Sequence, residues 1–170
     1  MLGIELKKPV GTGALIWLVL AAVILILDQA TKIWLQLSMD PHETVAVLPF
    51  FNITYLTNPG AAFSLLADAG GWQRWLFSLV AVVVSIGIVI WLWYLPRRGE
   101  AWLACGLVLI LGGALGNLVD RLVHGEVIDF IQVYWGEWSW PAFNVADSAI
   151  TVGAIIIIID SLRGARRPAR

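Results

Sequence analysis

Charged residues are scarce in this chain of 170 residues: they make up 14% of the sequence, whereas hydrophobic residues make up 59%. Soluble proteins average about 25% charged and roughly 45–50% apolar residues. A soluble fold of this size would lack the charge to cover its surface, so much of the surface must face lipid. The formal net charge of −1 also argues against a nucleic-acid-binding protein, which needs a concentrated basic face.

Cysteine and histidine are nearly absent. Cys105 is the single cysteine and allows no intramolecular disulfide, and two histidines, His42 and His124, cannot build a three-histidine metal site. The sequence also lacks HExxH, GxSxG and GxGD, which argues against a zinc protease, an α/β-hydrolase and a presenilin-type protease. Carboxylates remain as the groups able to carry chemistry, and we expect neither a metal nor an organic cofactor.

Four long apolar stretches are present instead. A helix needs about 20 residues to cross about 30 Å of hydrocarbon, and each stretch meets that length. The connection at 96–100 is so short that the second and third stretches must form an antiparallel hairpin. We therefore expect one domain over 1–170 with four transmembrane helices at approximately 14–35, 73–95, 101–121 and 144–162.

The basic residues predict the orientation. With four spans, both termini and the 96–100 connection lie on one side, which holds eight lysines and arginines against three on the other. The positive-inside tendency places the richer side in the cytoplasm. The longer segments 36–72 and 122–143 then face outward. The eight residues are Lys7, Lys8, Arg97, Arg98, Arg163, Arg166, Arg167 and Arg170.

The outward segments have a composition of their own. Residues 45–56 (VAVLPFFNITYL) are rich in β-branched and aromatic side chains and predict one or two short strands. Residues 131–143 (IQVYWGEWSWPAF) hold five aromatics and indicate a flap or platform at the outer membrane surface, with interfacial anchoring alone as the alternative. The predicted fold is thus an all-α integral membrane protein with a small extracytoplasmic β-rich segment and an aromatic loop.

Polar residues inside membrane spans need a reason, because each ionisable group costs roughly 2.5–3.5 kcal/mol at a helix centre. Simple reasons exist for some of them: Asp28 and Lys32 can form an i, i+4 ion pair, Arg121 can reach the headgroups, and Asn144 can cap the fourth helix. Nearly all the polar groups nevertheless fall at one depth, toward the outer face. Those in the spans are Asp28, Lys32, Asn117, Asp120, Arg121, Asn144 and Asp147. Asp129 is predicted in the loop between the third and fourth spans, and Asn58 and Gly60 return the chain to the outer surface.

Carboxylates forced together at low dielectric are expected to divide their roles, one protonated and its partner ionised, which is the arrangement that activates water. Spacing alone leaves open whether Asp120 or Asp129 is the partner of Asp147. A small proton-coupled transporter is the alternative function, although a proton relay would spread its ionisable groups across the bilayer. The spacing of Gly112 and Gly116 is typical of closely packed membrane helices.

Five sequence blocks, in order, resemble the lipoprotein signal peptidases, the bacterial type II signal peptidases. The resemblance covers nearly the whole chain. The blocks are 28–32 (DQATK), 58–63 (NPGAAF), 112–121 (GGALGNLVDR), 127–130 (VIDF) and 143–150 (FNVADSAI).

This resemblance implies an aspartic endopeptidase of the bacterial cytoplasmic (inner) membrane, with its site near the outer face. Its partners would be membrane lipids and diacylglyceryl-modified prolipoproteins, cut just before the modified cysteine, and we expect a monomer. Asp129 and Asp147 would be the catalytic pair. Asp120 would be a supporting carboxylate, either the partner of Arg121 or a packing group. The other residues implied to line or shape the site are Asn58, Gly60, Asn117, Arg121, Asn144, Asp28 and Lys32.

Overall fold

The computed structural model describes residues 12–60, 70–96 and 99–164. Its four long helices are each apolar and long enough to cross a membrane, which confirms the predicted number of membrane helices. A short 3-10 helix, η1 (Leu15–Trp17), leads into the first of them. The four helices are α1 (Leu18–Ser38), α2 (Gln73–Tyr94), α3 (Ala101–Val123) and α4 (Val145–Gly164).

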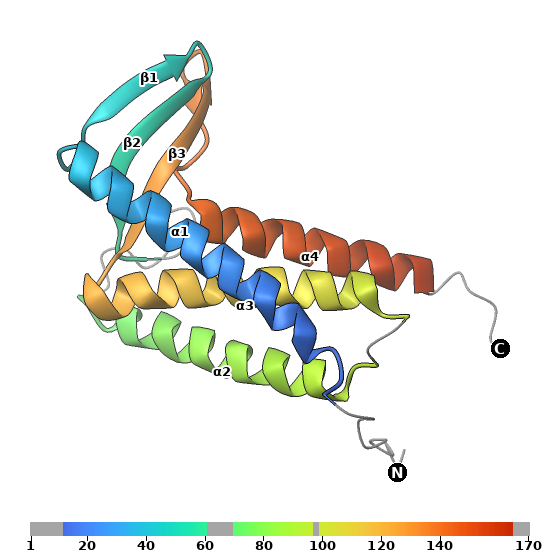
Figure 1. Ribbon diagram of the computed structural model, residues 1–170. Coiled ribbons are helices and arrows are strands. Elements are labelled where there is room, and N and C mark those ends of the chain that lie inside the picture. Colours follow the sequence, from blue (N-terminus) through green and yellow to red (C-terminus); the bar gives the residue numbers. More distant parts are fainter. Residues whose placement is uncertain (1–11, 61–69, 97–98, 165–170) are drawn as a thin grey trace.

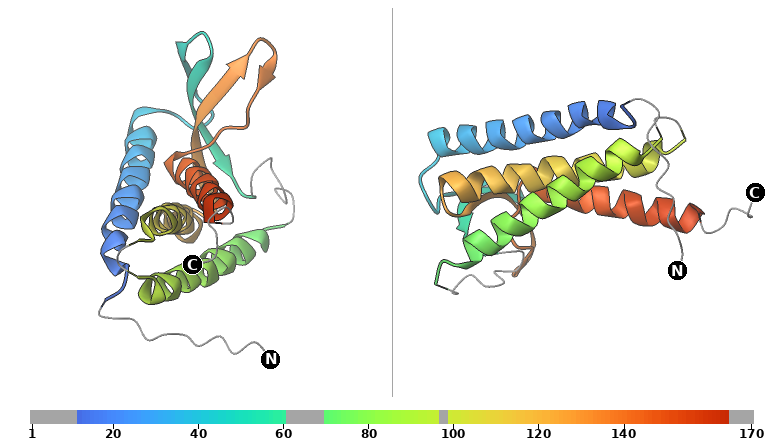
Figure 2. Two further views of the ribbon diagram at one scale, coloured as in Figure 1. Left: turned by 90° about the vertical axis from the view of Figure 1, so that its right-hand side faces the viewer. Right: turned by 90° about the horizontal axis from the view of Figure 1, so that it is seen from below.

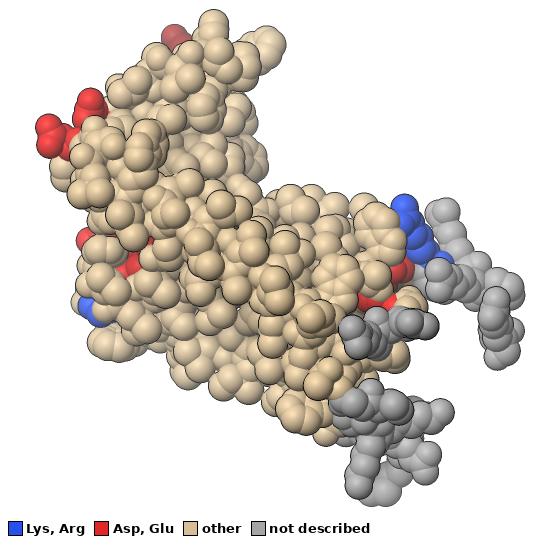
Figure 3. All heavy atoms as spheres, viewed as in Figure 1, with Lys and Arg blue, Asp and Glu red and all other residues tan. Residues whose placement is uncertain are grey.

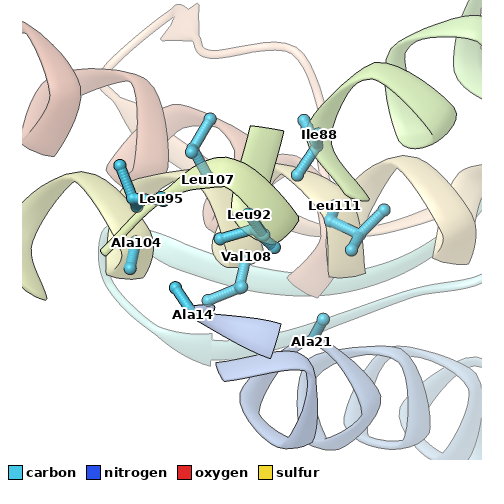
Figure 4. Packing of buried hydrophobic residues seen from close by; sticks show 9 residues of the cluster. All are labelled: Ala14, Ala21, Ile88, Leu92, Leu95, Ala104, Leu107, Val108 and Leu111. Carbon is cyan, nitrogen blue, oxygen red and sulfur yellow. The ribbon is translucent and has the colours of Figure 1, made fainter. Parts of the chain in front are cut away.

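Helix α3 lies between the other three (Figures 1 and 2). In its most apolar stretch 61% of the residues are buried inside the protein, against 17–22% in the other helices, so α1, α2 and α4 present most of their surface to lipid. At one end of the bundle, small and branched side chains of α1, α2 and α3 pack into a hydrophobic cluster that includes Ala21, Leu92 and Val108 (Figure 4).

Glycines let α3 approach both neighbours closely. A Cβ atom on Gly112 would lie 2.8 Å from the carbonyl oxygen of Ala21 in α1, in agreement with the predicted close packing. On the α4 side, a Cβ atom on Gly106 would lie 2.9 Å from the carbonyl oxygen of Gly153. The tight contacts on both sides fix the depth of α1 and α4 relative to α3.

A four-stranded antiparallel sheet stands at one end of the bundle (Figure 1). Segment 45–56 forms two of its strands, as predicted, and the aromatic segment contributes the others. The strands are β1 (Thr44–Leu48), β2 (Phe51–Asn58), β3 (Val127–Trp135) and β4 (Trp138–Ser139), in that order across the sheet.

The predicted position of Asp129 in a loop is wrong, because β3 begins at Val127. Residues 127–133 pair in antiparallel register with β2, and Asp129 is opposite Leu56. Its neighbours Ile128 and Phe130 are buried with Leu35 of α1 in a second hydrophobic cluster. Asp129 is therefore held on a strand that is anchored to the bundle on both sides of the carboxylate.

Charged side chains gather at the two ends of the molecule, and the surface between them carries almost none in the view of Figure 3. The start of α1 and the end of α4 lie at the end opposite the sheet (Figure 1). This distribution suits a protein whose middle lies in lipid. The basic residues at 7, 8, 97, 98, 166, 167 and 170 lie outside the described residues.

Candidate active site

Asp129 and Asp147 line the same cavity, of about 870 Å³, where the sheet meets the bundle. Asp129 comes from β3 and is 4% exposed, and Asp147 comes from the first turn of α4 and is half-buried. Asn58, Asn117 and Arg121 line the cavity as well. Residues of β2, α3, β3 and α4 thus converge on one polar pocket.

Asn144 connects the two carboxylates. Its Oδ1 accepts a hydrogen bond from the backbone N–H of Asp147 (2.8 Å), and its own backbone N–H donates to Oδ2 of Asp147 (3.3 Å). This reciprocal pair is the arrangement of a capping box at a helix N-terminus. At the same time Nδ2 of Asn144 donates to Oδ1 of Asp129 (2.8 Å). The predicted cap of the fourth helix is therefore also a member of the site.

Two further amides complete the set. Asn117 Nδ2 donates to Oδ1 of Asp147 (2.7 Å), and Asn58 Nδ2 donates to Oδ2 of Asp129 (3.2 Å). Each of the four carboxylate oxygens thus accepts a hydrogen bond from an uncharged amide. Among the described residues, no lysine or arginine forms a salt bridge with either carboxylate. The site therefore orients both groups without a direct salt bridge to either one.

Electrostatics separate the two carboxylates. The pKa of Asp129 is raised from 3.8 to about 7. Burial is the larger cause and repulsion from the Asp147 carboxylate is the second. The hydrogen bonds from Asn58 and Asn144 and the charge of Lys32 oppose this increase only in part. Asp129 therefore holds its proton in a large fraction of molecules at neutral pH.

Lys32 lies at the centre of a buried network beside the pair. Its Nζ is 2.7 Å from Oδ2 of Asp28 and 2.7 Å from Oδ2 of Asp120, and it donates to Oδ1 of Asn117 (3.1 Å). The predicted Asp28–Lys32 ion pair is present and has a third member. The predicted pairing of Asp120 with Arg121 is wrong, because Asp120 points toward α1 and forms its salt bridge with Lys32.

Asp28 and Asp120 also fix the elements that carry the pair. Oδ1 of Asp28 accepts a hydrogen bond from the backbone N–H of Ala146 (2.9 Å), one residue before Asp147. Oδ2 of Asp120 accepts one from the backbone N–H of Ile128 (3.1 Å), one residue before Asp129. The two supporting carboxylates therefore tie the start of α4 and the start of β3 to the bundle.

Arg121 and Gly60 form another edge of the cavity. The guanidinium of Arg121 lies 5.2 Å from the centre of the Phe77 ring, and Nη2 donates to the carbonyl oxygen of Gly60 (3.1 Å). The backbone N–H of Gly60 donates in turn to Oδ1 of Asn58 (3.0 Å). Nε of Arg121 is buried and has no hydrogen-bond partner among the described residues. The predicted reach of Arg121 to the headgroups is not what the structure shows.

Gln29 belongs to the network although the sequence analysis did not single it out. Its Nε2 donates to Oδ1 of Asp120 (2.9 Å) and to the carbonyl oxygen of Gly116 (3.2 Å). A polar residue next to Asp28 in an apolar span was the available signal.

Within the described residues, no group of three or more His, Cys, Asp or Glu side chains is arranged to hold a metal ion.

Comparison with known proteins assigns the family. Residues 20–163 match the signal peptidase (SPase) II family. The chain belongs to the signal peptidase II family. It is 52% identical over 153 residues to the lipoprotein signal peptidase of Pseudomonas aeruginosa, covering 89% of this chain and 90% of that protein. It is 53% identical over 147 residues to that of Shewanella woodyi, covering 86% and 82%.

Solved structures agree with this membership of the signal peptidase II family. A bacterial membrane enzyme determined by the in meso method at 2.3 Å superimposes with a TM-score of 0.77 at 29% identity, over 91% of this chain and 94% of that one. A second, at 1.9 Å, gives 0.72 at 32% identity, over 86% and 92%. Signal peptidase II enzymes are proteases, so this chain is a multi-pass membrane protease. The transporter alternative is not supported.

Proposed function

We propose that this chain removes signal peptides from prolipoproteins, cleaving just before a diacylglyceryl-modified cysteine, with Asp129 and Asp147 as its catalytic pair. The observation that carries the proposal is Asn144, whose side-chain amide donates to the carboxylate of Asp129 and whose backbone N–H donates to the carboxylate of Asp147, where both carboxylates line one cavity. The names of the relatives, lipoprotein signal peptidases, support the substrate class.

The two carboxylates divide the work of hydrolysis. Ionised Asp147, in the first turn of α4 where the helix dipole favours negative charge, takes a proton from water as the oxygen attacks the peptide carbonyl carbon. Protonated Asp129 donates its proton to the carbonyl oxygen, which gives a neutral tetrahedral intermediate. Asp129 then recovers that proton as the C–N bond breaks, and Asp147 gives the proton taken from water to the leaving amine.

Arg121 is suited to stabilise the transition state that leads to this intermediate, in which negative charge develops on the carbonyl oxygen. Its guanidinium lines the cavity and carries five N–H donors. Two of its nitrogens donate to the backbone oxygens of Asn117 (3.4 Å) and Gly60 (3.1 Å), and Nε has no partner in the part of the chain that the structure describes. We assign the remaining donors to the substrate backbone near the scissile bond. The interaction between the guanidinium and the carbonyl oxygen becomes stronger there as negative charge develops on that oxygen.

The membrane placement follows the charge asymmetry. We place both termini in the cytoplasm and the sheet and pocket at the outer face of the bacterial inner membrane. Trp135, Trp138 and Trp140 are all exposed on the aromatic segment, as tryptophans at a lipid–water interface are. Their exposure supports our placement of the aromatic segment against the outer headgroups. A monomer suffices, because the described pocket is built from residues of one chain.

The test is signal-peptide release by the purified protein in lipid vesicles. A diacylglycerylated prolipoprotein should be cut, and the same precursor without lipid should be cut far more slowly, because each buried methylene of the acyl chains adds about 0.8 kcal/mol of anchoring. Asp129→Asn and Asp147→Asn, alone or together, should each lower turnover by at least about 1,000-fold, without additivity. Full activity of folded Asp129→Asn would overturn the proposed pair.

A further inference from the structure

Lys32 makes a contact that neutralising Asp28 and Asp120 does not require. A lysine ammonium has three N–H donors and no acceptor. Two of the donors reach the carboxylates of Asp28 and Asp120, and the third reaches Oδ1 of Asn117 at 3.1 Å. Lys32 is only 1% exposed, so water does not compete for the third donor.

The third contact restricts how the Asn117 amide can be oriented. Its oxygen faces two donors, Nζ of Lys32 and Nδ2 of Asn144 (3.2 Å), so its NH₂ group faces Oδ1 of Asp147 at 2.7 Å. If the amide were reversed, an oxygen would face the carboxylate and an NH₂ group would face the ammonium. Both of those contacts are repulsive, because the ammonium has no acceptor and the carboxylate, when ionised, has no donor.

We propose that Lys32 is a positioning residue for hydrolysis: it fixes the orientation of the Asn117 amide, which then holds the Asp147 carboxylate in place. This inference rests on the proposed function of the Asp129–Asp147 pair. Among the described residues, no salt bridge joins Lys32 to either member of that pair. Its charge acts on Asp129 only through space, and its hydrogen-bond connection to the pair passes through Asn117. The network therefore connects α1 to the catalytic groups through α3.

A single substitution of Lys32 cannot test this, because it would leave two buried carboxylates without a cation and destabilise the bundle. A neutral triple variant, Asp28→Asn/Lys32→Met/Asp120→Asn, removes the charges together. Asn at position 28 keeps an oxygen for the backbone N–H of Ala146, and Asn at position 120 keeps one for Ile128. The triple variant thus retains the backbone anchors and loses the donor to Asn117.

The experiment is a double-mutant cycle with Asn117→Leu, which has a similar shape and no donor. The kcat and KM for a diacylglycerylated prolipoprotein are measured and normalised to folded protein. Each variant should lower kcat about 100-fold, the usual effect of misplacing a reacting group by about 1 Å, with KM little changed. The combination should also lose about 100-fold, not the roughly 10,000-fold of independent effects. Thr31→Val, an adjacent change on α1, should keep the wild-type kcat.

Three results would overturn the inference. One is a folded triple variant with nearly wild-type kcat, and another is an additive loss in the combination with Asn117→Leu. Failure of either variant to fold is the third, because that residue would then be needed for the bundle itself. A wild-type protein that releases no signal peptide would instead refute the proposed function, and the positioning role would fall with it.

Discussion

Replacing Gly116 by alanine should destabilise the protein by crowding Asp28. A Cβ atom on Gly116 would lie 2.6 Å from Oδ2 and 3.1 Å from Cγ of Asp28, and 3.2 Å from Cβ of Ala146. Asp28 is fully buried and cannot move away without losing Lys32 or the backbone N–H of Ala146. Overpacking of this kind costs about 1–3 kcal/mol.

Gly87 offers a matched control. It also lies inside a long apolar helix, α2, but a Cβ atom there would meet nothing within 4 Å. Alanine at position 87 should be neutral or stabilise the helix by up to about 1 kcal/mol, because alanine has the higher helix propensity. Because the gain in helix propensity is common to both helical positions, the two glycine-to-alanine variants should differ in unfolding free energy by the overpacking cost of about 1–3 kcal/mol.

Unfolding in mixed detergent micelles, followed by tryptophan fluorescence, measures this difference. Gly116→Ala should also lower turnover per folded molecule, since Asp28 holds the backbone of α4 one residue before Asp147, a member of the proposed catalytic pair. Gly87→Ala should leave turnover unchanged. Equal stabilities of the two variants would refute the argument that the Gly116 side of α3 is packed against the network of Asp28 and Lys32.

Three more results are expected. The pKa of Asp129 is about 7 in the folded protein and 3.8 when unfolded. Its contribution to stability is therefore fully present below pH 3.8 and is lost as the pH rises from 3.8 to about 7. The Tm of wild type should therefore fall over that range more than the Tm of Asp129→Asn, and parallel curves would contradict this; turnover should also fall above pH 7. Asp120→Asn should lower thermal stability more than turnover per folded molecule, and an inactive, fully stable variant would make Asp120 a catalytic group. Reporter fusions after Leu95 and Arg170 should report cytoplasm and one after Ser139 the exterior; an exterior fusion at the C-terminus would exclude the proposed orientation.

Features that depend on local spacing were predictable. The apolar runs predict the four helices, and the i, i+4 spacing of Asp28 and Lys32 predicts their ion pair. The position of Asn144 before an apolar run predicts a helix cap, and Asn144 does cap α4. Each of these depends on neighbours within one or two helical turns, so a single sequence contains the necessary information.

Features that depend on contacts between distant segments were not predictable in the same way. The salt bridge of Asp120 with Lys32 joins residues 88 positions apart, and only the packing of α3 on α1 reveals it. Asp129 was expected in a loop because it lies in the connection between the third and fourth spans, whereas pairing with β2 makes this part of the connection a strand. The choice between Asp120 and Asp129 as the partner of Asp147 came from the family resemblance, since spacing did not distinguish them.

The cap at Asn144 has a consequence for how the protein behaves when it is disturbed. Unwinding the first turn of α4 would break the bonds of Asn144 to both carboxylates in one event. Fraying at this position would therefore release Asp129 and Asp147 from their shared partner together, and would leave each carboxylate with one side-chain amide donor, Asn58 or Asn117. Hydrolysis is therefore coupled to the folding of the first turn of α4. A protease molecule in which this turn has unwound is expected to be unable to cut neighbouring membrane proteins.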